Sequence, residues 1–151
     1  MKRIILLVIL LVMIEIAFYI LMGDLEAVSG HNILDMGLQN NEETYQILSD
    51  YGAEGRSIYN KIQLVDFIFP LCYGLLFISI MKYQGCKLTI IPLLAATFDY
   101  IENINIYRML RAYPDNLMLG SFNGIFTVLK FTLLGISLIL MVVYGLRRWR
   151  T

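Results

Sequence analysis

The sequence predicts an all-α protein, an integral membrane four-helix bundle with a short extra helix in its first external loop. Hydrophobic residues make up 58% of the 151 residues and charged residues 16%, whereas soluble domains have roughly 45–50% and about 25%. Four apolar runs are each long enough to cross a bilayer, which takes about 20 residues. The 12 Lys and Arg balance the 12 Asp and Glu, so no net positive field exists that would bind nucleic acid.

The first predicted span covers residues 4–22 and contains one charged residue, Glu15. This run is too long for the apolar region of a secretory signal and carries an acid near its centre, which favours retention as a membrane helix. Residues 23–61 hold five glycines and seven acidic residues, and we expect them to form a polar external loop. Within the loop, a capping-box pattern followed by apolar residues predicts a short helix over about residues 42–51.

The remaining apolar runs predict three further spans, over residues 62–81, 88–110 and 117–146. Pro70 lies within the second span and should bend it, because proline removes one backbone hydrogen bond from a helix. The last run is longer than a bilayer is thick, so this helix should tilt or project from the membrane. We expect the four spans to form one domain over residues 1–151.

Basic residues predict the orientation of these spans. Seven Lys and Arg residues lie at the N-terminus, between the second and third spans and at the C-terminus, and four lie on the other side. Short loops rich in Lys and Arg stay in the cytoplasm. The sequence therefore predicts a multi-pass protein of the cell membrane with both termini in the cytoplasm.

Five ionisable residues lie within the predicted spans. A charge at the centre of a membrane helix costs about 2.5–3.5 kcal/mol, so each needs a partner or a function. Their distances from the ends of the spans place them at similar depths, and we expect them to meet in the outer half of the bundle. The five are Glu15, Asp66, Asp99, Glu102 and Lys130.

Helical periodicity places further polar residues beside these charges. Residues three and four positions apart share one face of a helix, so the second, third and fourth spans each carry a polar stripe. Lipid cannot hydrogen-bond to such stripes, and they should therefore point towards one another. The residues that this spacing adds are Tyr73, Asn103, Asn123 and Thr127.

Two interpretations of these polar residues are open. In the first, they hold the helices together. In the second, they line a polar cavity, because up to four acids face the single lysine Lys130, and acids without a cation must bind a proton, a metal or a cationic ligand. Asp66, Asp99 and Glu102 would then act as acids or bases. Glu15, Lys130 and the other polar side chains of the stripes would bind the ligand.

No cofactor or metal site is expected. The sequence has no glycine-rich phosphate loop, no nucleophile elbow and no pair of histidines at metal spacing. Its one histidine, His31, falls in the predicted external loop. Cys72 and Cys86 do not form a C-x-x-C pair, which makes a redox centre or a disulfide unexpected.

Two stretches carry a resemblance to a known group of proteins. They are GAEGRSIYNKIQLVDFIFPLCYGL and LLAATFDYIENINIYRMLRAYP. Together they resemble small bacterial four-helix membrane proteins of no assigned function, in which a span with Asp and Phe-Pro precedes a span with Asp-x-x-Glu-Asn. This resemblance implies a fold and no activity.

A second resemblance rests on layout. MGDLEAV after the first span, a long external loop, an acid early in the second span and a basic C-terminus are similar to the emopamil-binding-protein superfamily of sterol isomerases and sigma-2 receptors. The resemblance implies that Asp24 and Asp66 line a cavity for sterol-like amphiphiles or cationic ligands. The histidine and tryptophan of the isomerase site have no counterpart in the predicted bundle, because His31 and Trp149 lie outside it.

Three functions are consistent with these observations. The first is a cavity that binds a membrane lipid or amphiphile, with or without acid–base catalysis. The second is a small proton-coupled transporter component, which would need a homodimer because four helices are few for alternating access. The third is a structural or accessory subunit that binds a partner membrane protein.

Overall fold

The computed structural model describes residues 1–34, 41–114 and 120–149, with only the backbone of Asn41 and of residues 120–123. Within these ranges the regular structure is helical and there is no strand, which confirms the all-α prediction. The helices are α1 (Lys2–Ser29), α2 (Asn41–Asp50), α3 (Gly52–Asp66), α4 (Phe69–Tyr83), α5 (Ile90–Ala112) and α6 (Gly120–Trp149).

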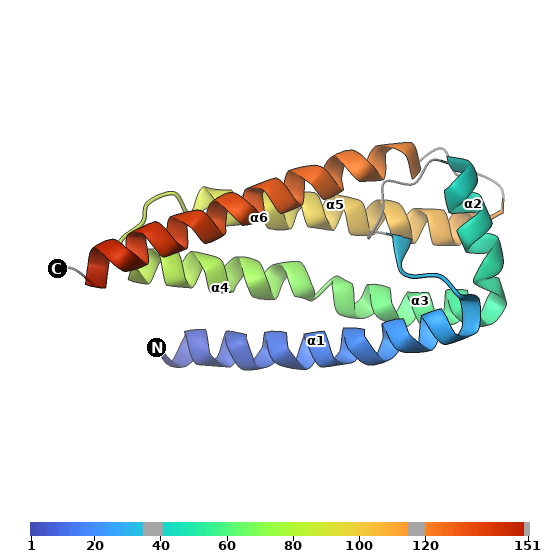
Figure 1. Ribbon diagram of the computed structural model, residues 1–151, viewed down its shortest axis with the longest axis horizontal. Helices are drawn as coiled ribbons and strands as arrows, with labels where there is room; N and C mark the ends of the chain where they lie inside the picture. Colours follow the sequence, from blue (N-terminus) through green and yellow to red (C-terminus); the bar gives the residue numbers. More distant parts are fainter. Residues whose placement is uncertain (35–40, 115–119, 150–151) are drawn as a thin grey trace.

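The long helices lie side by side along the longest axis of the molecule (Figure 1). α3 and α4 follow one another end to end, α1 packs against both, and α6 packs along α5. α2 crosses the end of the molecule that is remote from the chain termini, and we call this the α2 end. Both termini lie at the opposite end together with the turn between α4 and α5, and we call this the terminal end.

The predicted polar loop over residues 23–61 is wrong in part. α1 continues to Ser29, because Leu25 packs into the interior with no exposed surface. The helix ends where Gly30 adopts a left-handed conformation with φ of 72°, and the Gly30 amide donates to the carbonyl of Glu26 at 2.8 Å. α3 also occupies part of the predicted loop. The predicted short helix over residues 42–51 is confirmed as α2.

Pro70 explains the break between α3 and α4. A proline at this position supplies no amide hydrogen for the carbonyl of Asp66, four residues earlier, and its ring clashes with that carbonyl. α3 accordingly ends at Asp66, and α4 begins at Phe69 with the proline in its first turn. The bend that the sequence predicts is therefore present as a break of two residues.

Side chains of α5 satisfy the carbonyl groups at this break. Asn103 Nδ2 donates to the Asp66 carbonyl oxygen at 3.1 Å, and the Tyr100 hydroxyl donates to the Phe67 carbonyl oxygen at 2.9 Å. Asn103 is completely buried. The amide of Asn103 thus replaces the hydrogen-bond donor that Pro70 lacks.

This replacement gives a direct test. Asn103→Leu keeps the size of the side chain but leaves a buried carbonyl without a donor, and we expect the free energy of unfolding to fall by about 1–3 kcal/mol. In a Pro70→Ala background, the new backbone amide can donate to Asp66, so the same change should cost less. Thermal unfolding of the four proteins in one detergent measures the difference. Equal costs in both backgrounds would contradict this account of the break.

The main hydrophobic core lies at the α2 end. Tyr59 accepts a hydrogen bond from the Leu34 amide at 2.9 Å, and Tyr51 donates to the Asn32 carbonyl at 2.5 Å, so two tyrosines tie the segment after α1 to the core. The buried residues of this core are Leu25, Ile33, Leu34, Leu48, Tyr51, Tyr59, Ile62, Ile106, Met109 and Leu110.

Towards the terminal end, the outer faces of α1 and α6 expose large apolar side chains. Three helical stretches are long and apolar enough to cross a membrane: Lys2–Ser29, Gly52–Tyr83 and Gly124–Trp149. In the first and the last of these stretches, only 11% of the most apolar 18-residue segment is buried within the molecule. These features indicate a membrane protein, because water does not tolerate apolar surfaces of this extent.

Candidate functional site

A buried ion cluster joins α5 to α6. Lys130 Nζ lies 2.5 Å from Glu102 Oε2 and 3.1 Å from Asp99 Oδ1. Lys130 is 5% exposed, Asp99 3% and Glu102 0%. Asp99 and Glu102 share one face of α5 because they are three positions apart. The structure thus joins in ion pairs three of the five charged residues that the sequence predicts to meet.

Two hydroxyl groups extend this cluster. The Tyr73 hydroxyl on α4 donates to Asp99 Oδ2 at 2.9 Å, and Thr127 on α6 donates to Glu102 Oε1. Each carboxylate therefore has one oxygen near the lysine and the other on a hydroxyl group. The cluster connects three helices, α4, α5 and α6.

A cavity of about 300 Å³ lies between α1 and α6 and reaches one side of this cluster. Its polar wall consists of Glu15, Asp66, Asp99 and Lys130. The rest of the wall is apolar and consists of Phe18, Met22, Ile33, Phe69, Phe131 and Leu134. Because α1 packs against α3 and α4 while α6 packs against α5 and α4, the cavity occupies the side of the bundle where α1 and α6 face one another.

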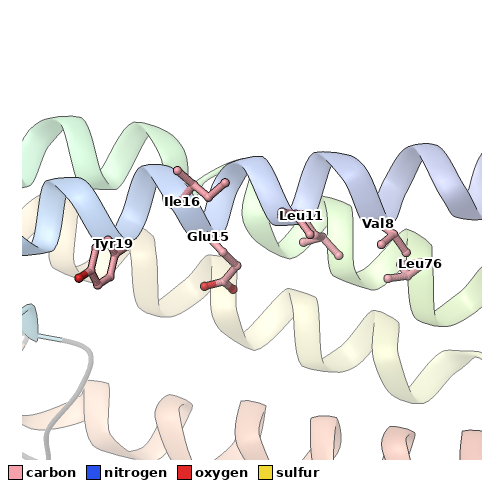
Figure 2. Close-up of a pocket in the computed structure, with 7 residues that line it drawn as sticks. Val8, Leu11, Glu15, Ile16, Tyr19 and Leu76 are labelled. Atoms are coloured by element: carbon pink, nitrogen blue, oxygen red, sulfur yellow. The ribbon is translucent and has the colours of Figure 1, made fainter.

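A second, larger depression of about 510 Å³ continues along α1 towards the terminal end (Figure 2). Six of its lining residues are apolar or aromatic, namely Val8, Leu11, Val12, Ile16, Tyr19 and Leu76. Glu15 lines this depression as well as the cavity. Figure 2 shows Glu15 projecting from the same side of α1 as Tyr19 and Leu11. Glu15 therefore marks the junction between a polar cavity and an apolar groove.

The charges around the cavity are unequal in number. Among the described residues, three carboxylates and one ammonium group line it, and the carboxylate of Glu102 lies directly behind Lys130. Lys130 is shared between Asp99 and Glu102. A site with this balance favours ligands that carry a positive charge or donate hydrogen bonds, because they compensate the excess of carboxylates.

The other predicted site residues have different positions. Asn103 serves the backbone break described above, and Asp24 is exposed near the end of α1, outside the described lining of the cavity. Asp24 and Asp66 therefore do not share this cavity wall as the second resemblance implies. The side chain of Asn123 lies outside the described part of the structure.

Sequence reasoning missed the aromatic wall of the cavity. Phe18 packs edge-on against Phe69 with ring centroids 5.7 Å apart, and Phe69 contacts Tyr73 in the same way at 5.2 Å. No signal in the sequence distinguishes such phenylalanines from those that face lipid, because both occur in continuous apolar runs.

Within the described residues, no group of three or more His, Cys, Asp or Glu side chains is arranged to hold a metal ion. Comparisons of the chain with protein-family models, with curated proteins and with solved structures give no match, so the site is interpreted from its own geometry.

Proposed function

We propose that this chain is a multi-pass protein of the cell membrane whose cavity between α1 and α6 binds a membrane lipid or another amphiphile. In this proposal α5 also spans the membrane, in addition to the three stretches that are apolar enough to do so. Its 23 residues are about 34 Å long, which matches the roughly 30 Å of hydrocarbon in a bilayer. Because ends and loops rich in Lys and Arg stay in the cytoplasm, both termini would then be cytoplasmic.

The observation that carries the proposal is the combination of a charged wall and an apolar groove on the same side of the bundle. An amphiphile needs both, because its polar group must be hydrogen-bonded and its chain must stay out of water. The polar group would lie against Asp66, Asp99 and Lys130. The chain would follow the apolar side of α1 beyond Glu15, where the surface faces lipid.

In this arrangement, the acids that contact the ligand differ from the acid that has a structural role. Asp66 and Asp99 line the cavity and are the carboxylates that would exchange a proton with a bound headgroup. Glu102 is completely buried and is not among the described lining residues. In this proposal Glu102 fixes the position of Lys130 and has no contact with the ligand.

A structural role is the second candidate, and the full burial of Glu102 favours it. If the whole cluster only holds α4, α5 and α6 together, the exposed apolar face of α6 would bind a partner membrane protein. No described observation specifically favours the transporter.

Neutralising the cavity acids distinguishes the two candidates. Asp66→Asn and Asp99→Asn keep the shape of the side chain but remove its charge, and we expect both proteins to fold while losing most of a co-purifying amphiphile. Asp66→Asn is the cleaner test of ligand binding, because Asp99 also contributes to the ion cluster. Native mass spectrometry reports the retained ligand, and thermal unfolding reports the fold.

Asp24→Asn is the matched control, since Asp24 is an exposed acid outside the described cavity wall. It should keep both ligand and stability. If the two cavity variants retained ligand at the wild-type level while their melting temperatures collapsed, the cavity proposal would be abandoned in favour of the structural role.

A further inference from the structure

Glu15 occupies an unusual position for an acid. It is the one charged residue between Arg3 and Asp24, in the most apolar part of α1. Its side chain is exposed, and no described residue forms a hydrogen bond or an ion pair with its carboxylate. Lipid neither hydrates nor pairs a carboxylate, so an ionisable side chain at such a position indicates a functional role.

No cation among the described residues lies within ion-pair distance of Glu15. Lys130 lines the same cavity, but its ammonium group is held in the ion cluster. Arg150 is the one cationic side chain outside the described part of the chain. It follows Trp149, which lies 19 residues beyond Lys130 on α6, or about 28 Å along the helix axis. A cation beside Glu15 would therefore come from outside the chain.

The surroundings of Glu15 indicate what kind of molecule carries this cation. Glu15 lines both the cavity and the apolar groove. Figure 2 shows it between Tyr19 on one side and Leu11 and Val8 on the other. The groove thus continues past Glu15 for about two helical turns with apolar walls. A cationic group attached to an alkyl chain fits this arrangement, because the charge lies beside the carboxylate and the chain lies in the groove.

The chemistry of the wall favours one kind of cationic group. The carboxylates of Glu15, Asp66 and Asp99 are hydrogen-bond acceptors, and each carboxylate can accept several hydrogen bonds. A primary ammonium group donates three hydrogen bonds and is small enough to approach a carboxylate directly. A quaternary ammonium group carries the same charge but has no hydrogen to donate. The wall is therefore better suited to a primary amine.

We propose that Glu15 binds the primary ammonium group of an amine-bearing amphiphile, such as a long-chain amine or a phospholipid with an ethanolamine headgroup. The inference rests on the proposed function, because it names the headgroup of the ligand in the same cavity. Hydrogen bonds between charged groups are about twice as strong as those between neutral groups. Glu15 would thus determine which amphiphile the site accepts, while Lys130 and Glu102 maintain the ion cluster behind it.

Three probes with the same alkyl chain test charge and hydrogen-bond donation separately. They are tetradecylamine, tetradecyltrimethylammonium and the neutral tetradecyl glycerol ether. Their binding to the full-length protein in a neutral detergent is measured by native mass spectrometry, and we expect tetradecylamine to bind most tightly. Glu15→Gln should weaken its binding at least about ten-fold, the usual effect of losing hydrogen bonds to a charged group. Binding of the neutral ether should not change.

Glu26→Gln is the matched control, because it makes the same change at an exposed position on α1 outside the described lining of the cavity and the groove. It should bind all three probes as the wild type does. Equal weakening in both variants would replace the site by general attraction between charges and overturn the proposal. Unchanged binding of tetradecylamine to Glu15→Gln would overturn it as well. Thermal unfolding without probe shows whether each variant is folded.

The same measurements separate this inference from the proposed function. Failure of the wild type to bind any of the three probes would contradict the cavity itself, whereas equal binding of all three would contradict only the ammonium site. A fourth probe, tetradecanoyl lysophosphatidylethanolamine, identifies the source of the amine. Tighter binding of this lipid than of tetradecylamine supports a phospholipid headgroup, and the reverse order supports a free amine. In both cases the tighter ligand should depend on Glu15.

Discussion

Lys130→Met is expected to lower the free energy of unfolding by about 3–5 kcal/mol, the usual cost of removing one member of a buried ion pair. Lys130 is the described cation that contacts both Asp99 and Glu102. Without it, two carboxylates that are almost completely buried remain without a cation beside them. Unfolding in a single detergent measures the change, and Lys87→Met, at an exposed position in the α4–α5 turn, provides the control.

Double-mutant cycles test the pairing itself. Combining Lys130→Met with Glu102→Gln removes the stranded charge together with its partner, so the double variant should be more stable than the sum of the single effects predicts. The cycle with Asp99→Asn should show weaker coupling, since Asp99 also accepts a hydrogen bond from Tyr73 and lies 3.1 Å from the lysine. Additive effects in both cycles would contradict the pairing.

Leu25→Ala should cost about 2–5 kcal/mol, the range for a large core residue replaced by alanine. Leu25 has no exposed surface, and its Cδ1 atom lies 3.6 Å from where a Cβ of Gly55 would be. The helices pack closely around Leu25, so neighbouring atoms cannot move to fill the space that the shorter side chain leaves. Leu25 lies beyond the first predicted span, residues 4–22, so the proposed topology places it outside the bilayer, where burial from water drives folding.

Leu6→Ala makes the same change on the same helix at a position that is 65% exposed. In the proposed topology Leu6 faces lipid chains, and lipid is as apolar as the leucine itself. We therefore expect little change in stability. A comparable loss at both positions would show that the core at the α2 end does not dominate the stability of the fold.

The long helices could be predicted because a bilayer requires long apolar segments, and such runs stand out in any sequence. α3 could not be recognised by the same criterion. Its buried residues Tyr59, Ile62 and Asp66 have helical spacing, but glycines and charges around them resemble a loop when counted by composition. The α3 helix is amphipathic, and periodicity was the signal that would have found it.

The candidate site, too, could be predicted only in part from the sequence. Asp99, Glu102 and Lys130 could be brought together from the sequence, because charges are rare in apolar runs and must find one another. The separation of Glu102 from the cavity wall could not be predicted. It depends on how segments that are distant in the sequence pack around α5.

The cluster also bears on the order in which the helices enter a membrane. α5 is not among the three described stretches apolar enough to cross a membrane without help, and the lysine that neutralises its carboxylates lies on α6. Because α6 is synthesised later, a nascent chain that ends after α5 lacks the lysine that pairs with Asp99 and Glu102 in the folded protein. Insertion of α5 and α6 as one hairpin avoids this state. If α5 spans the membrane as proposed, Lys130 makes the last helix a condition for the stable insertion of the helix before it.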